Sequence, residues 1–279
     1  MSNWFDSSGP NDSLSMDDRG LAYGDGLFET IAIRNGQPRL WRQHMRRLET
    51  SCARLSLPFP GEDSLSALLR RAVDGSGFAE SDATAKLVVT AGSGRRGYAR
   101  PQDLAVNVRI GVFPYRKLDG ACFSDGVEIL ACETRLAQQP ATAGMKTLNR
   151  LEQVLGRMEV GGAFEGVMCD SDKRIICGTM SNVFIATNKQ VATPRLDRCG
   201  VEGVTRAEIL ERAPLANIDI DVRDISLDEC CRADEIMLAN SQFGLLRARK
   251  LGDASLERTV VFERLRDLLA DAGFDEYTR

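Results

Sequence analysis

Histidine is almost absent from the sequence, because His44 is the only one among 279 residues. Zinc sites of the HExxH and C2H2 types need several histidines, and Ser-His-Asp triads and most general-base schemes also use this residue type. The scarcity argues against these motifs, and we expect no metal centre.

Paired cysteines and long apolar runs are also missing. The eight cysteines form no CxxC motif, and Cys230 and Cys231 are adjacent, which indicates reduced thiols in a cytoplasmic protein. The sequence has no run of eighteen or more apolar residues, and its first twenty residues lack the basic and apolar segments of a signal peptide. Neither membrane insertion nor secretion is therefore supported.

An excess of positive charge is lacking as well. Lys plus Arg number 36 against 40 for Asp plus Glu, so the formal net charge is −4 and no overall basic field exists for nucleic acid or an anionic membrane. We expect neither as a partner. What is present is a globular composition, 43% hydrophobic and 27% charged, with enough material for one large domain or two smaller ones.

The first part of the chain mixes strand and helix patterns. Residues 27–33 (LFETIAI) predict a strand, and Asn35-Gly36 supplies the residues of a tight hairpin turn. Apolar residues at spacings of three and four from Trp41 to Leu55 predict an amphipathic helix. The same criteria predict a helix at 65–73 and strands at 86–90, 104–113 and 127–132. This mixture indicates an α+β fold.

A polar, turn-rich stretch at 114–120 (PYRKLDG) is a candidate linker. It divides the chain into an N-terminal α+β subdomain, 1–115, and a C-terminal subdomain, 121–279. In the second subdomain the pattern predicts helices at 149–160, 205–212 and 258–272, with strands at 166–170, 174–176, 182–186, 218–222 and 235–239.

The segment 92–97 (GSGRRG) matches GxGxxG and follows a predicted strand. A dinucleotide site needs a helix to begin there, but the next residues, YARP, do not open one. The segment instead indicates a glycine-rich loop with Arg95, Arg96 and Arg100, which suits a loop that folds over an anionic small molecule. A solvated basic loop explains the pattern equally well.

Lysine is scarce, with six residues, so the place of each one is informative. Lys146 is the only charged residue in 141–149 (ATAGMKTLN). Apolar surroundings disfavour the ammonium form, and a neutral amine is a nucleophile that can condense with a carbonyl group. The alternative is a lysine that reaches solvent at the start of the helix that follows.

Two segments have the residues of a phosphate site. Gly203-Val204-Thr205-Arg206 opens a predicted helix, where backbone N–H groups and a threonine hydroxyl can bind an anion. Asn240-Ser241 follows a predicted strand and is a candidate for a second rim of the same site. Ordinary helix capping by the threonine and a simple turn at 240–241 are the alternatives.

Together these residues resemble the fold-type IV pyridoxal-phosphate enzymes, a family that includes branched-chain and D-amino acid aminotransferases and 4-amino-4-deoxychorismate lyases. The resemblance covers nearly the whole chain. Segment 18–30 (DRGLAYGDGLFET) is similar to the family's opening segment, and 44–48 (HMRRL) is similar to the helix whose second arginine holds the cofactor phosphate. The resemblance implies two α/β subdomains of the D-amino acid aminotransferase-like architecture. It also implies a homodimer in which a loop of one subunit covers the other's pocket.

The same resemblance implies pyridoxal 5'-phosphate as cofactor and assigns residues to it. Lys146, in MKTLNRLEQVL, matches the catalytic lysine that binds the cofactor covalently, and Arg47 matches the phosphate-binding arginine. The remaining matches to the phosphate site are Val204, Thr205, Asn240 and Ser241.

Two stretches, KTLNRLEQ and GSGRRGY, are more similar to the lyases than to the aminotransferases. This implies an enzyme that converts 4-amino-4-deoxychorismate to 4-aminobenzoate and pyruvate, a step toward folate. Lys146 would be covalent anchor, base and acid in turn. Candidates for the substrate side are Tyr23, Thr30, Arg96 and Tyr98.

One position departs from the family. Its members usually have a glutamate five residues before Asn182, where the carboxylate pairs with the protonated pyridine nitrogen, but this chain has Cys177. A neutral thiol cannot supply that negative charge. Glu165 is near in sequence but corresponds to a different family position.

We therefore expect a weakened lyase, because an elimination that yields an aromatic ring demands less of the electron sink than transamination does. The alternatives are a branched-chain or D-amino acid aminotransferase of the same fold, and a non-catalytic homologue that binds a ligand.

Overall fold

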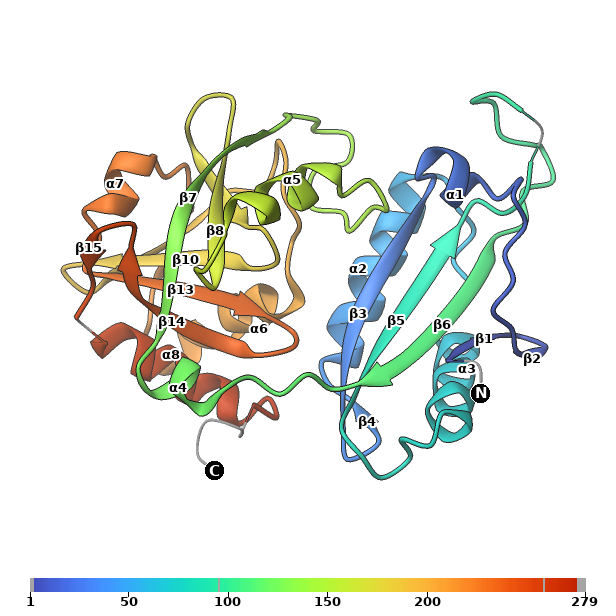
Figure 1. Cartoon of the computed structure of the whole chain (residues 1–279), viewed down its shortest axis with the longest axis horizontal. Coiled ribbons are helices and arrows are strands. Elements are labelled where there is room, and N and C mark those ends of the chain that lie inside the picture. Colours follow the sequence, from blue (N-terminus) through green and yellow to red (C-terminus); the bar gives the residue numbers. More distant parts are fainter. Residues whose placement is uncertain (1–2, 95, 258, 275–279) are drawn as a thin grey trace. The chain divides into compact units, whose positions relative to one another are not determined.

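The computed structural model describes residues 3–94, 96–257 and 259–274, so Arg95 of the glycine-rich loop and Arg258 of the last predicted helix lie outside it. The chain forms two compact units (Figure 1). Unit 1 comprises Met1–Lys117 and Met145–Asn149, and unit 2 comprises Leu118–Gly144 and Arg150–Arg279.

Unit 1 is a six-stranded antiparallel sheet with two long helices. The strand order is β2-β1-β6-β5-β3-β4, and β3 pairs with β5 from Gly26↔Thr90 to Ile33↔Ala83. Figure 1 shows α2 and α3 on the same face of this sheet. Its elements are β1 (Trp4–Asp6), β2 (Gly9–Pro10), α1 (Arg19–Tyr23), β3 (Gly26–Arg34), β4 (Gln37–Pro38), α2 (Trp41–Arg54), α3 (Glu62–Gly75), β5 (Ala83–Thr90) and β6 (Asn107–Pro114).

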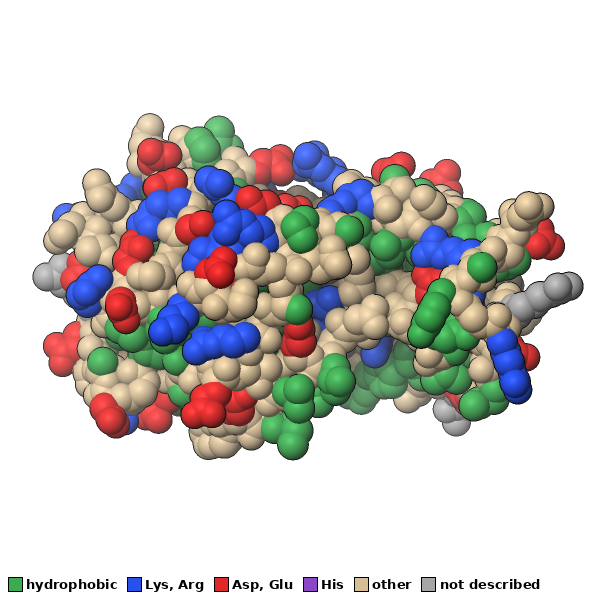
Figure 2. Space-filling view, turned by 90° about the horizontal axis from the view of Figure 1, so that it is seen from above, with side chains coloured by type: hydrophobic (Ala, Val, Ile, Leu, Met, Phe, Trp, Pro, Cys, Tyr) green, Lys and Arg blue, Asp and Glu red, His purple; other side chains and the backbone are tan. Residues whose placement is uncertain are grey.

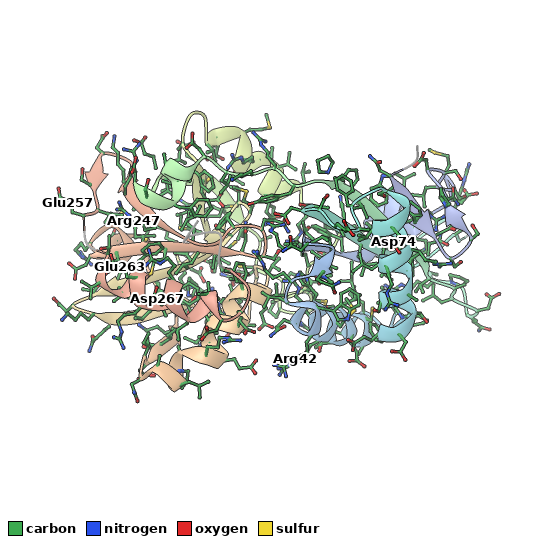
Figure 3. All side chains as sticks on the ribbon, turned by 90° about the horizontal axis from the view of Figure 1, so that it is seen from below. Arg42, Asp74, Arg247, Glu257, Glu263 and Asp267 are labelled. Carbon is green, nitrogen blue, oxygen red and sulfur yellow. The ribbon has the colours of Figure 1, made fainter. Side chains whose placement is uncertain are left out.

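Apolar periodicity explains how unit 1 packs. Met45, Leu48 and Cys52 recur at helical spacing and are buried on the face of α2 that covers the sheet. The exposed Arg42 extends outward from the same helix (Figure 3). Leu40, the residue before α2, provides no side-chain cap. The helix is therefore stabilised mainly by burial of its apolar face against β3.

Unit 2 is built on a nine-stranded mixed sheet. The order is β12-β11-β10-β13-β14-β7-β8-β9, with β15 paired to β14, and the pairs β11–β12, β14–β7 and β7–β8 are parallel. Its elements are α4 (Gly120–Ser124), β7 (Val127–Leu136), α5 (Leu151–Glu159), β8 (Glu165–Asp170), β9 (Ile175–Gly178), β10 (Asn182–Thr187), β11 (Gln190–Pro194), α6 (Val204–Arg212), the 3-10 helix η1 (Ala213–Ala216), β12 (Ile220–Arg223), α7 (Leu227–Cys231), β13 (Glu235–Asn240), β14 (Gly244–Leu251), β15 (Ala254–Ser255) and α8 (Val260–Ala270).

The α+β class and most of the predicted elements are confirmed, with boundaries shifted by a few residues. The segment that contains Lys146 differs from expectation, because it belongs to unit 1 and not to the C-terminal subdomain. Phe28 N–H donates to Lys146 O at 2.9 Å and Leu148 N–H donates to Gly26 O at 3.0 Å, so the segment is an additional strand partner of β3. Long-range backbone pairing of this kind leaves no local pattern.

The cysteines are free thiols, and the visible surface of unit 2 carries charges of both signs. All eight cysteines are free, and only Cys231 is classed as exposed. Lys and Arg side chains are interspersed with Asp and Glu side chains across the visible face of unit 2 (Figure 2). Within the described ranges, none of the helices combines the length and the apolar character needed to span a membrane.

Candidate functional site

In unit 1 the candidate site begins on strand β3, whose two faces differ. Leu27, Ile31 and Ile33 alternate into the core, and Glu29 lies on the same face with 1% of its surface exposed. A buried carboxylate needs partners because desolvation disfavours its charge. Helix α2 supplies them from His44 and Arg47, which are three residues apart on one helix face.

The contacts of Glu29 orient Arg47. Arg47 Nε donates to Glu29 Oε1 at 2.9 Å, and its Nη2 donates to Glu29 Oε2, so the pair is bidentate. Glu29 Oε2 is also 2.6 Å from His44 Nδ1. Burial alone would raise the pKa of Glu29, but Arg47 and His44 lower it to about 2. Burial lowers the pKa of His44, so we assign a neutral imidazole that donates from Nδ1.

Lys146 is positioned by Phe28, the residue before Glu29 on β3. Backbone pairing brings Lys146 opposite Phe28, and Lys146 Nζ is 4.4 Å from the centroid of the Phe28 ring. Thr30 lies two residues further along β3, opposite Lys86 of β5. Phe28 and Glu29 are consecutive on β3, and they contact Lys146 and Arg47, respectively.

The glycine-rich loop is folded onto α1. Tyr23 Oη accepts a hydrogen bond from Gly97 N–H at 3.0 Å, and the Tyr23 and Tyr98 rings meet edge to face at 5.5 Å between centroids. Arg96 and Tyr98 are exposed. No helix begins in the described residues 91–94 and 96–106, as the sequence predicts for the segment after GxGxxG.

In unit 2 the start of helix α6 has the properties of an anion site. Its N-cap, Gly203, has no side chain to bond the first-turn N–H groups. Thr205 is fully buried, and its Oγ1 has no hydrogen-bond partner among the described residues. A Cβ on Gly203 would overlap Asn182 Oδ1, so only glycine permits this approach. The start of α6 therefore has an unpaired buried hydroxyl and an N-cap without a side chain, and Gly203 lies against Asn182.

Asn240 and Ser241 lie near this place in unit 2. Asn182 of β10 pairs with Ala239 of β13, the residue before Asn240. The Asn240 side chain accepts from Gln242 N–H and Phe243 N–H at 2.9 and 3.0 Å, and its amide donates to Met180 O at 3.3 Å. Asn240 thus shapes the turn that carries Ser241.

Backbone hydrogen bonds within unit 2 join Gly144 to the segment before α6. Gly144 N–H donates to Gly200 O at 3.0 Å, and Glu202 N–H donates to Gly144 O at 2.9 Å. Gly144 therefore pairs with the segment that leads into α6.

Cys177 is a buried, uncharged thiol on β9. Its neighbours are apolar and sulfur-containing side chains of the cluster Cys132, Leu136, Met168, Ile176, Leu196 and Cys199. Burial, with the negative charge of Glu165 as second cause, raises the pKa of Cys177 to about 12. Cys177 carries no negative charge at neutral pH.

Glu165 does not replace the missing carboxylate, because its oxygens are already bonded. Oε1 accepts from Thr179 N–H at 3.1 Å and from Thr179 Oγ1 at 2.5 Å. Oε2 accepts from Met180 N–H at 3.2 Å and from Ser181 Oγ at 2.8 Å. The residue is fully buried and holds the turn between β9 and β10.

Comparisons with known proteins define the family. Residues 26–251 match the model for amino-transferase class IV, so the chain belongs to this family. A curated aminodeoxychorismate lyase of Vibrio harveyi is 33% identical over 243 residues, covering 85% of this chain and 86% of that protein. The crystal structure of 4-amino-4-deoxychorismate lyase from Pseudomonas aeruginosa is similar with a TM-score of 0.88 and 41% identity, covering 96% and 98% of the chains. A D-alanine aminotransferase of Bacillus licheniformis is 26% identical, covering 82% and 80%.

The residues present fit most of a pyridoxal phosphate molecule. Thr205 Oγ1 and the first-turn N–H groups of α6 suit a phosphate. Lys146 provides a primary amine and Arg47 an oriented guanidinium. Cys177 does not fit the role of a charged partner for a pyridinium, because burial keeps it protonated.

Some residues that support this site have a weak local signal in the sequence or none. Glu29 is the partner that fixes Arg47, and a carboxylate at an inward position of an apolar strand was the available signal. Arg19, which contacts the backbone of the glycine-rich loop, had no local signal.

Proposed function

We propose that this chain is a pyridoxal-phosphate-dependent lyase that converts 4-amino-4-deoxychorismate to 4-aminobenzoate and pyruvate. The observation that carries the proposal is Lys146, which pairs through its backbone with β3 and has Nζ 4.4 Å from the centroid of the Phe28 ring, in a chain 41% identical to a lyase of known structure over 96% of its length. We propose that this reaction serves folate biosynthesis.

Each cofactor-binding residue has a proposed role. Lys146 Nζ is the covalent anchor, and Arg47, Val204, Thr205, Asn240 and Ser241 bind the phosphate. Glu29 keeps the Arg47 guanidinium in a fixed orientation through two hydrogen bonds. When bound, pyridoxal phosphate supplies a sink for the electrons left when a proton leaves the amine-bearing carbon.

Lys146 also moves the proton. With the substrate bound, Lys146 Nζ would remove the proton from the amine-bearing carbon. The C–O bond to the enolpyruvyl group breaks as the ring becomes aromatic, and Nζ returns the proton to the methylene carbon of enolpyruvate, giving pyruvate. We propose that Tyr23, Thr30, Arg96 and Tyr98 bind the substrate.

Cys177 weakens the lyase without abolishing it. The uncharged thiol cannot stabilise a protonated ring nitrogen, so the sink is poorer than with a carboxylate. Aromatisation provides a driving force that transamination lacks. A lyase therefore tolerates Cys177 in place of the glutamate better than an aminotransferase does.

A binding protein without catalytic activity is the second candidate, and the same Cys177 favours it. An aminotransferase of this fold is a third, supported by the 26% identity to a D-alanine aminotransferase. Cys177 argues against it, because transamination depends more strongly on the electron sink.

We further propose a cytoplasmic homodimer with no nucleic-acid or membrane partner. Helix α5 supports the dimer, because its outer face is apolar and exposed. Leu151 is 70% exposed, Met158 is 76% exposed, and Val154 and Leu155 lie between them on the same helix. Monomeric proteins rarely leave such a stripe uncovered, and a second copy of the chain would bury it.

Borohydride trapping tests the cofactor part of the proposal. The protein is incubated with pyridoxal phosphate, its visible spectrum is recorded, and the reduced adduct is mapped by peptide mass spectrometry with Lys146→Ala as control. We expect the visible absorption band of a protein-bound Schiff base, and label on Lys146 alone. Absence of both would favour the binding protein.

Two assays then separate the enzymes. Release of 4-aminobenzoate identifies the lyase, whereas glutamate formed from an amino acid and 2-oxoglutarate identifies an aminotransferase. Glutamate without 4-aminobenzoate would overturn the lyase assignment.

A further inference from the structure

Arg19 is a buried cation that bonds the backbone of an exposed loop. The residue is 3% exposed. Its Nη1 donates to Gly97 O at 3.0 Å and to Ala99 O at 3.3 Å, and its Nη2 donates to Tyr98 O at 2.8 Å. One guanidinium therefore holds three consecutive carbonyl groups. Arginine has five N–H donors in a rigid plane, enough for these three carbonyl groups and a carboxylate, whereas lysine has three donors on a single nitrogen.

Asp25 completes the arrangement. It accepts from Arg19 Nε at 2.9 Å, and Arg100, at the end of the loop, donates to it from Nε at 3.0 Å and from Nη2 at 2.5 Å. Burial alone would raise the pKa of Asp25, but Arg100 and Arg19 lower it. The carboxylate therefore ties the buried cation to the end of the loop.

The start of the loop is held by backbone bonds. Arg19 N–H donates to Gly92 O at 2.8 Å, and Gly94 N–H donates to Asp17 O at 3.2 Å. Tyr23 Oη accepts from Gly97 N–H at 3.0 Å. The backbone of this loop is thus fixed on both sides of its exposed part.

Two side chains of the same loop, Arg96 and Tyr98, are exposed. Tyr98 is 87% exposed, and Arg96 is exposed beside it. Surface loops ordinarily retain conformational freedom, and ordering them on binding costs affinity. A loop ordered in advance presents a guanidinium and a phenol without that cost.

We propose that Arg19 is a positioning residue for substrate binding, which holds residues 96–100 so that Arg96 and Tyr98 are preorganised for a carboxylate-bearing substrate. The identity of the substrate rests on the proposed function. The ordering of residues 96–100 by Arg19 does not rest on the proposed function and can be measured separately.

The experiment compares variants of the protein loaded with pyridoxal phosphate. Arg19→Gln removes the three carbonyl contacts, and Arg100→Gln frees the end of the loop from Asp25. We expect both to raise KM for 4-amino-4-deoxychorismate by about tenfold or more, with kcat and the cofactor absorption spectrum nearly unchanged. We also expect faster cleavage by trypsin after Arg96. Arg70→Gln, at an exposed position on α3, is the matched control and leaves all four readouts unchanged.

A double variant ties the effect to the loop side chains. In an Arg96→Gln background, Arg19→Gln should raise KM by a clearly smaller factor, because one of the two presented groups is already absent. An equal factor in both backgrounds would contradict the inference, as would unchanged trypsin sensitivity of Arg19→Gln. Should Arg19→Gln fail to fold, the partly exposed Arg100 carries the same test. A wild type without lyase activity would refute the proposed function, and the proteolysis would still decide whether Arg19 orders the loop.

Discussion

Replacing Glu29 by glutamine tests the ion pair at the base of the site. The side chain keeps its shape but loses the charge that both Arg47 and His44 contact. A pKa lowered from 4.5 to about 2 corresponds to about 3 kcal/mol of stability, at roughly 1.4 kcal/mol per pKa unit. Breaking a buried pair by removing one partner typically costs a similar amount, about 3–5 kcal/mol. We expect Glu29→Gln to lower the free energy of unfolding at pH 7 by about 3 kcal/mol.

The lowered pKa of Glu29 determines how this stability difference changes with pH. The pKa of Glu29 is depressed in the folded protein, so its contribution is complete above pH 4.5 and is lost as the pH falls toward 2. The difference between wild type and Glu29→Gln should therefore shrink over this range, where the wild-type carboxylate becomes protonated. Urea unfolding followed by fluorescence measures it, because both tryptophans, Trp4 and Trp41, lie in unit 1.

Two outcomes would refute this reasoning. One is wild-type stability of Glu29→Gln at pH 7, and the other is a stability difference that does not shrink in acid. Glu80→Gln, at an exposed position, is the control and should show neither effect. Glu29→Gln should also bind pyridoxal phosphate more weakly, because Arg47 loses its fixed orientation.

Three further predictions concern unit 2. Thr205→Val removes the unpaired buried hydroxyl, so equilibrium titration should show about tenfold weaker binding of pyridoxal phosphate, while thermal unfolding of the apoprotein is little changed. Gly203→Ala drives a Cβ into Asn182 Oδ1 and should both lower the melting temperature and weaken cofactor binding, whereas retention of both would show that the turn has room. Cys177→Glu restores a carboxylate and should raise turnover and shift the cofactor absorption spectrum; no change in either would show that this position does not limit the enzyme.

Local patterns predicted most of the fold. Strand β3 and helix α2 followed from alternation and from spacings of three and four, which burial enforces directly. Strands β11 and β14 were not predicted. Gly244–Leu251 carries Arg247, Arg249 and Lys250, so its apolar signal is diluted although it lies centrally in the sheet order.

Some residues of the candidate site have a signal in the local sequence, and others do not. Lys146 has a local signal because it is the only charged residue in 141–149, and Thr205 has one because it opens a predicted helix. The contacts of Arg19 with the loop were not, because they join residues 78 to 80 positions apart. The pairing of residues 145–149 with β3 is likewise a tertiary contact, and local sequence contains no record of it.

The most direct test of the central claim is the stoichiometry of product release. Protein loaded with pyridoxal phosphate is given 4-amino-4-deoxychorismate, and 4-aminobenzoate and pyruvate are measured by fluorescence and by a coupled dehydrogenase, with Lys146→Ala in parallel. The account predicts equal amounts of the two products from the wild type and neither from Lys146→Ala. Product formation by Lys146→Ala at the wild-type rate, or no product from wild type that carries the cofactor on Lys146, would contradict it.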